Sequence, residues 1–108
     1  MRIHHVALRT GDVARLERFY AGQLGLQVLR RDDARGVVWL DAGGTVIMLE
    51  PAGSGEPGVP PGTMELVAFA VDDKEAWRAK LTVEAETAHT LYFRDPDGRR
   101  VAVSDYRF

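Results

Sequence analysis

The chain contains one pattern twice, and this repeat constrains its fold more than any other feature. The first copy, IHHVALRTGDVARLERFY at residues 3–20, joins an alternating stretch to an amphipathic stretch through a turn. Aligning Ile3 with Met64 repeats the pattern and places Asp12 on Asp73. A repeated strand and helix indicates two copies of one folding unit. We therefore expect the function of the chain to lie between the two copies.

The first copy is predicted to continue as a βαβββ unit. Alternation with a period of two places His5 and Ala7 on one face of the first strand, with the residues between them turned toward the helix. Asp12 is expected to cap that helix, and Gly25 to follow its C-terminus in a left-handed conformation. Turn residues then separate three short predicted strands, at residues 26–31, 35–41 and 45–50.

A proline-rich segment separates the two copies. Residues 51–63, PAGSGEPGVPPGT, hold four of the five prolines and are predicted to be a linker without helix or strand. We interpret the chain as a single domain, residues 1–108, with a first module at 1–50 and a second at 64–108. The linker permits the two modules to pair within one chain or to be exchanged between chains.

The second module resembles the first but is shorter. Asp72 or Asp73 is expected to cap its helix, with Glu75 completing a capping box with Asp72 and Trp77 in the core. The predicted strands are residues 64–71, 83–87, 89–95 and 100–105. Leu16 aligns with Trp77 at an offset of 61, whereas later strands align at an offset of 54, so seven residues are missing between helix and strands.

Composition excludes several classes of function. The chain has 108 residues, 45% of them hydrophobic and 28% charged, as expected for one globular domain. A net charge of -2 with both signs scattered along the chain provides no basic stripe for nucleic acid or for a membrane surface. The absence of cysteine excludes disulfides and thiolate chemistry, and with no leader pattern at Met1 we expect a cytoplasmic protein. A phosphate-binding loop and a nucleophile elbow are also absent, so a small molecule is the expected partner.

Two stretches resemble a known family. HHVALRTGDVARLERFYAGQLGLQV is similar to the opening of the vicinal oxygen chelate superfamily, and LYFRDPDGRRVAV is similar to its closing hairpin. That superfamily includes glyoxalases, bleomycin-resistance proteins, fosfomycin-resistance transferases and extradiol dioxygenases. The resemblance implies an α+β fold in which two βαβββ modules with curled mixed sheets surround a shared cavity, usually completed in a homodimer.

The same resemblance implies where a divalent metal would bind. Its four ligand positions fall on His5, Met48, Leu66 and Ala102. Only the imidazole of His5 is a metal ligand of the required kind, because such an ion needs three or four nitrogen or oxygen donors. Glu50 lies two residues beyond Met48 on the same strand face and would raise the number of ligands only to two. We therefore predict no metal and no other cofactor.

The preferred hypothesis is a metal-free protein that binds or sequesters a small, partly aromatic compound between the modules. Aromatic side chains would stack on the ligand, and Glu50 with His5 would orient it. Trp39 and Tyr92 have the strand parity of cavity residues, although an aromatic residue in a strand is as often simply packed. Ala7 and Ala68 are predicted to line the cavity. The predicted ligand-binding residues are His5, Trp39, Met48, Glu50, Leu66, Tyr92, Ala102 and Ser104.

Two alternatives remain open. The first is a glyoxalase-like lyase or dioxygenase that holds zinc, nickel, manganese or iron through His5 and Glu50. It requires a one-residue slip that turns Glu65 onto the cavity face. The second is a structural partner of a larger enzyme, for which the sequence offers no positive support.

Overall fold

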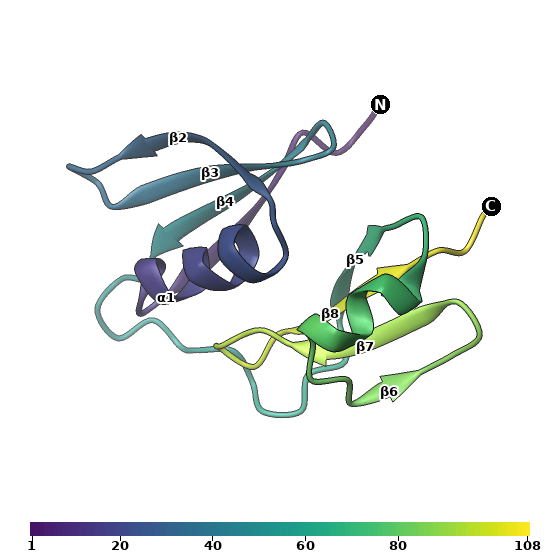
Figure 1. Ribbon diagram of the computed structural model, residues 1–108. Coiled ribbons are helices and arrows are strands. Elements are labelled where there is room, and N and C mark those ends of the chain that lie inside the picture. The colour runs from purple at the N-terminus through teal and green to yellow at the C-terminus, as the bar shows by residue number, and fades with distance from the viewer. The chain divides into compact units, whose positions relative to one another are not determined.

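The computed structural model describes all residues, 1–108, and the chain divides into two compact units, Met1–Gly58 and Val59–Phe108. The boundary falls inside the proline-rich segment. Each unit contains one four-stranded mixed sheet and its own helical segment (Figure 1). No helix combines the length and the apolar character needed to cross a membrane.

The sheet of the first unit has the strand order β1-β4-β3-β2. β1 runs parallel to β4, and the other neighbouring strands are antiparallel. The elements of this unit are β1 (His5–Thr10), α1 (Val13–Glu17), η1 (Arg18–Gln23), β2 (Gln27–Asp32), β3 (Val37–Ala42) and β4 (Thr45–Pro51). The predicted βαβββ order is therefore confirmed, with strand ends displaced by one or two residues.

The helical segment of the first unit packs on one face of this sheet. Asp12 caps it by accepting a hydrogen bond from the backbone N–H of Arg15, and Gly25 follows it at φ 81°, as predicted. The segment begins as an α-helix and widens at Arg18 into a π-helix, in which Leu24 N–H donates to the Phe19 carbonyl. The buried residues between helix and sheet are Leu16, Phe19, Tyr20, Leu24, Val38, Leu40, Ile47 and Leu49.

The second unit repeats this topology with the strand order β5-β8-β7-β6. Its elements are β5 (Leu66–Ala70), η2 (Lys74–Lys80), β6 (Ala85–Glu86), β7 (Thr90–Arg94) and β8 (Arg100–Ser104). Ala7 pairs with Met48 in the first sheet, and Ala68 pairs with Ala102 in the second. The register thus reproduces both alignment offsets inferred from the sequence.

Three details of the second unit differ from expectation. η2 is a 3-10 helix capped by Asp73, and Glu75 bonds to Arg78 rather than forming a capping box with Asp72. Trp77 is only half-buried, and the buried position of η2 belongs to Lys74. β6 is two residues long instead of five. The seven missing residues account for the short β6, because little chain remains between helix and sheet to form the edge strand.

Candidate functional site

Each sheet has a face opposite its helical segment, which we call the open face. Strand alternation and register place the predicted ligand-binding residues on the open faces of the two sheets. In the first unit these residues are His5, Trp39, Met48 and Glu50, and in the second unit they are Leu66, Tyr92, Ala102 and Ser104.

His5 lies at the exposed start of β1, beside His4. The Nδ1 atoms of the two imidazoles are 2.9 Å apart, and the rings meet edge to face. One Nδ1 must donate and the other accept in this contact, so two protonated rings cannot make it. His4, which is not among the predicted site residues, is the direct partner of His5 in the structure.

Glu50 is held by an arginine on the neighbouring strand. Arg9 Nη1 lies 3.0 Å from Glu50 Oε1, and Arg9 Nε donates to both oxygens of Glu56 at 2.8 and 2.9 Å. The hydrogen bonds that Arg9 donates to Glu56 and Glu50 raise the pKa of Arg9. The bonds from Arg9 and from the backbone N–H of Gly53 lower the pKa of Glu56. The start of the proline-rich segment is thereby fastened to β1, and the Glu50 carboxylate is occupied by an ion pair.

The register separates His5 from Glu50. Val46 is the partner of His5 on β4, whereas Glu50 is the partner of Arg9, four residues farther along the strands. Four residue steps correspond to roughly 13 Å along a strand. No group of three or more His, Cys, Asp or Glu side chains arranged to hold a metal ion occurs in the structure.

The one-residue slip that would turn Glu65 onto the cavity face is not seen in the strand pairing. Leu66, Ala68 and Ala70 pair in continuous register with β8, and Glu65 lies exposed before β5 begins. A thioether and two aliphatic side chains therefore occupy three of the four implied ligand positions. The donors present at those positions do not fit a divalent ion.

Trp39, on the open face of the first unit, contacts two arginine side chains. The guanidinium carbons of Arg30 and Arg35 lie 5.3 and 5.9 Å from the ring centroid of Trp39. Met48 is the β4 partner of Trp39 and is half-buried. Trp39 thus already has cation–π partners within its own unit.

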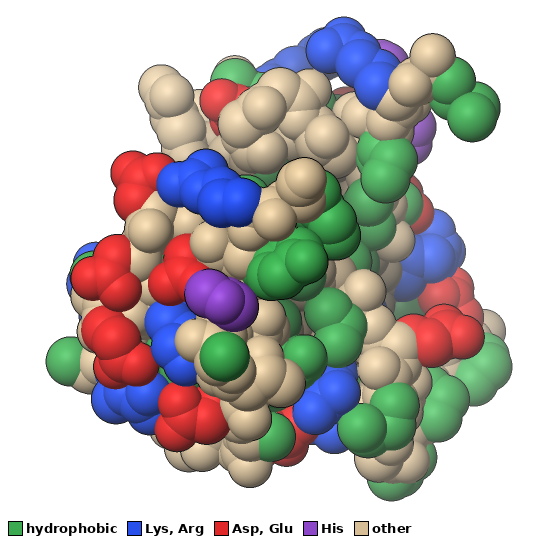
Figure 2. All heavy atoms as spheres, turned by 90° about the vertical axis from the view of Figure 1, so that its right-hand side faces the viewer, with side chains coloured by type: hydrophobic (Ala, Val, Ile, Leu, Met, Phe, Trp, Pro, Cys, Tyr) green, Lys and Arg blue, Asp and Glu red, His purple; other side chains and the backbone are tan.

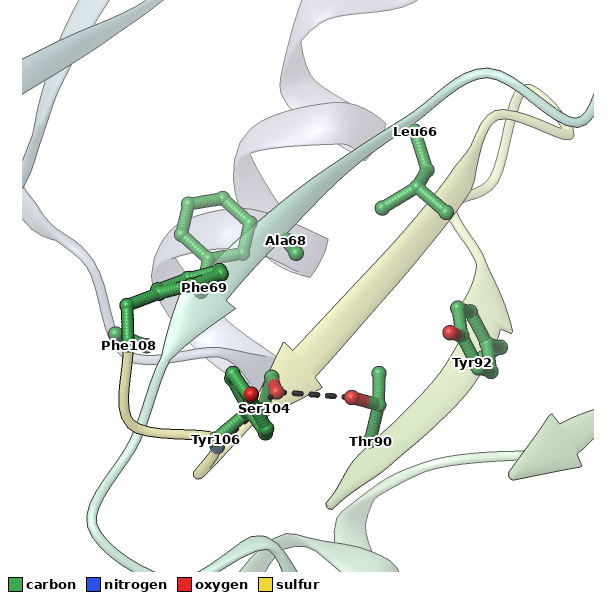
Figure 3. A pocket seen from close by; sticks show the side chains of 9 residues that line it. Leu66, Ala68, Phe69, Thr90, Tyr92, Ser104, Tyr106 and Phe108 are labelled. Atoms are coloured by element: carbon green, nitrogen blue, oxygen red, sulfur yellow. Dashed lines mark hydrogen bonds between the residues drawn. The ribbon is translucent and has the colours of Figure 1, made fainter. Parts of the chain in front are cut away.

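A hollow of about 220 Å³ lies on the open face of the second unit (Figure 3). No charged side chain lines it. Its polar groups include the hydroxyls of Thr90 and Ser104, which form a 2.8 Å hydrogen bond to each other. The lining residues are Leu66, Ala68, Phe69, Ala70, Thr90, Tyr92, Ser104, Tyr106 and Phe108.

The hollow is lined by three of the predicted ligand-binding residues and by the predicted cavity residue Ala68, but not by Ala102. Leu66, Tyr92 and Ser104 line it, whereas Ala102 is fully buried between its partner strands. The guanidinium carbon of Arg100 lies 4.2 Å from the centroid of Tyr92, so one side of that ring is covered. Hydrogen bonds from Arg94 and Arg100 lower the pKa of the nearby Glu84, the bond from Arg94 being the larger cause.

Sequence reasoning missed the C-terminal part of this hollow. Tyr106 and Phe108 line it, and both side chains are exposed. A signal was present, because Ala102, Ser104, Tyr106 and Phe108 share one parity, and the prediction stopped following that parity where the strand ended. Figure 2 shows hydrophobic side chains beside a histidine on the surface.

Comparison with known proteins places this architecture in a family. The family model described as Glyoxalase/Bleomycin resistance protein/Dioxygenase superfamily matches residues 2–103. The chain belongs to this superfamily. The resemblance inferred from the opening and closing motifs is thereby confirmed for nearly the whole chain. A search of curated protein sequences found no match.

Solved structures of this superfamily share the fold. Lactoylglutathione lyase from Agrobacterium tumefaciens is 23% identical, with a TM-score of 0.74 over 95% of this chain and 92% of that one. The trypanothione-dependent glyoxalase I of Leishmania major is 24% identical, with a TM-score of 0.74 over 96% and 86%. The fosfomycin resistance protein FosX from Mesorhizobium loti is 13% identical, with a TM-score of 0.83 over 99% and 93%. At these identities the likeness concerns the fold alone.

Proposed function

We propose that this chain is a metal-free member of the superfamily that binds or sequesters a small, partly aromatic compound. The single observation that carries the proposal is the hollow on the open face of the second unit. Its lining is apolar and aromatic, with a few hydroxyl groups, which is the usual composition of a small-molecule site.

The donor chemistry of the open faces supports a site without metal. Among the four positions that the family resemblance assigns to metal ligands, only His5 carries a nitrogen or oxygen donor. Glu50 is paired with Arg9 instead of being available beside His5. The catalytic alternative, a lyase or dioxygenase of the glyoxalase type, would need donors that these positions do not provide.

Metal analysis tests this proposal directly. We expect elemental analysis of the purified protein to find zinc, nickel, manganese and iron well below one ion per chain. Titration with each ion should leave the melting temperature unchanged. Stoichiometric, tightly held metal would overturn the metal-free proposal and favour the lyase or dioxygenase.

Ligand binding is tested by a thermal-shift screen with small aromatic and matched aliphatic compounds. A compound that binds the folded chain raises its melting temperature, by several degrees when its concentration is far above the dissociation constant. We expect aromatic compounds to produce such shifts and aliphatic compounds of equal size to produce smaller ones. A screen in which no compound class shifts the melting temperature would argue against a binding protein.

The proposal includes a homodimer, as the family resemblance implies. Light scattering coupled to size-exclusion chromatography should give twice the 12.0 kDa mass of one chain. If the chain is a monomer at all concentrations, the homodimer proposal is wrong. The binding function is still tested by the thermal-shift screen.

A further inference from the structure

We infer that Tyr106 and Phe108, in the C-terminal segment Asp105–Phe108, are part of the ligand site and that the ligand is a neutral aromatic ring bearing a hydrogen-bond acceptor such as a carbonyl. The ring would pack against Tyr106, and the acceptor would bind the hydroxyl pair of Thr90 and Ser104. This inference rests on the proposed function and names the class of compound that the hollow takes. Figure 3 shows these side chains at the hollow.

The C-terminal segment is fixed in place at its first residue. Asp105 donates its backbone N–H to the His89 carbonyl at 2.9 Å. Its carboxylate accepts from the backbone N–H of Lys74 at 3.0 Å and contacts His89 Nδ1 at 2.9 Å. The bonds from Lys74 and His89 lower the pKa of Asp105. Several contacts on one residue therefore fix where the segment leaves the sheet.

Tyr106 presents an aromatic surface from this fixed point. Its backbone N–H donates to Ser104 Oγ at 3.3 Å, which ties the residue to the end of β8. Its ring meets those of His89 and Phe108 edge to face, with centroids 5.6 and 5.1 Å apart. Even so, 54% of Tyr106 remains exposed. The ring is held by its neighbours and still has surface for another aromatic group.

The hydroxyl groups of Thr90 and Ser104 have one O–H proton that their mutual hydrogen bond does not use. Two hydroxyls supply two protons, and the 2.8 Å bond between Thr90 and Ser104 uses one of them, whichever group donates. Ser104 Oγ also accepts from Tyr106 N–H, which uses a lone pair and no proton. The remaining O–H proton has no protein acceptor, so the pair offers a donor to a ligand. A ligand with an acceptor fits this site better than one without.

The charge and size of the hollow narrow the ligand further. Every lining residue is uncharged, so the lining itself offers a charged ligand no counter-ion. The volume of about 220 Å³ lies below the ~300–1,000 Å³ of pockets for drug-sized ligands. A single ring with a short substituent matches both properties.

Three probes of similar size separate the two features of the ligand. Acetophenone has the ring and the carbonyl, ethylbenzene lacks the carbonyl, and cyclohexyl methyl ketone lacks the aromatic ring. Binding to the full chain is measured by calorimetry or by NMR titration. We expect acetophenone to bind roughly three- to tenfold more tightly than either matched probe, since an aromatic contact and a hydrogen bond each contribute about that factor.

Variants then assign each feature to its residues. Tyr106→Leu should weaken acetophenone roughly three- to tenfold and remove its advantage over cyclohexyl methyl ketone, and Tyr106→Phe should retain both. The double variant Thr90→Val with Ser104→Ala should remove the advantage over ethylbenzene. Both hydroxyls must be replaced, because either one alone can donate. Arg107→Ala is the matched control on the same segment, since Arg107 lies outside the lining, and it should bind acetophenone like the parent chain.

The outcomes distinguish this inference from the proposed function. If acetophenone binds and Tyr106→Leu leaves its affinity unchanged, the inference is wrong while the binding function stands. If no probe binds while the thermal-shift screen finds another ligand, the inference is wrong and the proposed function stands; if the screen also finds none, both fail. If Tyr106→Leu changes the mass in solution and leaves the affinity unaltered, the segment covers a contact with a second copy, and the inference is again wrong. Circular dichroism of each variant confirms that it is folded.

Discussion

Lys74 is a charged residue that the second unit buries. Only 8% of the residue is exposed, and its ammonium group donates to the Thr87 carbonyl at 2.7 Å and lies 3.3 Å from Glu86. Replacing it in Lys74→Met leaves the carbonyl without its donor. We expect the free energy of unfolding to fall by about 1–2 kcal/mol, measured by urea denaturation.

Lys80 provides the control for this change, because it lies on the same helix and is exposed. Its ammonium group is 5.0 Å from the centroid of Trp77, an interaction worth less than ~1 kcal/mol at an exposed site. Lys80→Met should therefore have the smaller effect. Equal losses in the two variants would show that the buried hydrogen bonds of Lys74 contribute nothing specific.

The sequence was enough to predict which face of a strand a residue occupies. It was not enough to predict which distant side chain that residue pairs with. The period-two alternation of β1, β3 and β4 is enough to place His5, Trp39 and Glu50 on the open face. The ion pair between Arg9 and Glu50 joins residues 41 positions apart. Its formation depends on strand register, which no local pattern of residues specifies.

At the scale of single elements, the cap of α1 is the clearest agreement between sequence and structure. Asp12 Oδ1 accepts from the Arg15 N–H at 3.0 Å. Asp12→Ala should lower the free energy of unfolding by about 1 kcal/mol, while Asp12→Asn should retain most of the cap. Chemical denaturation followed by circular dichroism measures both. Asp33→Ala, in an exposed turn, is the control, and a loss there as large as in Asp12→Ala would contradict the capping role.

The strands differ sharply in how much they contribute to their cores. Leu91 on β7 is fully buried, whereas Leu29 lies at a register shift in β2 and is 53% exposed. Leu91→Ala should cost about 2–5 kcal/mol of unfolding free energy, because it removes buried surface and leaves a cavity. Leu29→Ala should cost less than ~1 kcal/mol. Similar losses in denaturant midpoint for both variants would contradict the burial described for β7.

For the two helical segments, the sequence predicted where each begins but not which type of helix forms. Asp12 and Asp73 align and both cap a helix, so the start of each helix followed from the repeat. The type of helix did not follow. Adjacent Phe19 and Tyr20 are both buried where the first segment widens into a π-helix, and the second is a 3-10 helix before a shortened connection. Helical spacing in a sequence does not distinguish these types, which differ in which carbonyl each N–H bonds.

At the scale of the whole molecule, the repeat determined the architecture. Each copy forms its own sheet with equivalent pairing, so the alignment relates the topology and register of one sheet to those of the other. The site was harder to predict, because the hollow includes two residues beyond the last strand. A pattern that defines strands does not show where a following segment turns, and that turn depends on Asp105 meeting His89 and Lys74.

The charge network gives the molecule a predictable response to acid. Hydrogen bonds from neighbouring arginines, backbone N–H groups, a lysine or a histidine lower the pKa of six carboxyl groups, those of Asp32, Glu56, Glu75, Glu84, Glu86 and Asp105. A carboxyl group whose pKa is lower in the folded chain stabilises it above the unfolded pKa of about 4. That stabilisation is lost as the pH falls through the lower, folded-state values.

We therefore expect the free energy of unfolding to be nearly constant with respect to these groups from pH 7 to about 5 and to fall below about pH 4. Urea denaturation across this range measures it. Arg78→Met should reduce the acid-dependent fall, because Arg78 is the first cause of the lowered pKa of both Glu75 and Glu86. Arg2→Met, in the other unit, should preserve it. In 1 M salt, where charges are screened within about 3 Å, the acid-dependent fall in unfolding free energy should also become smaller. An acid-dependent fall that changes neither with salt nor with Arg78→Met would show that other groups cause it.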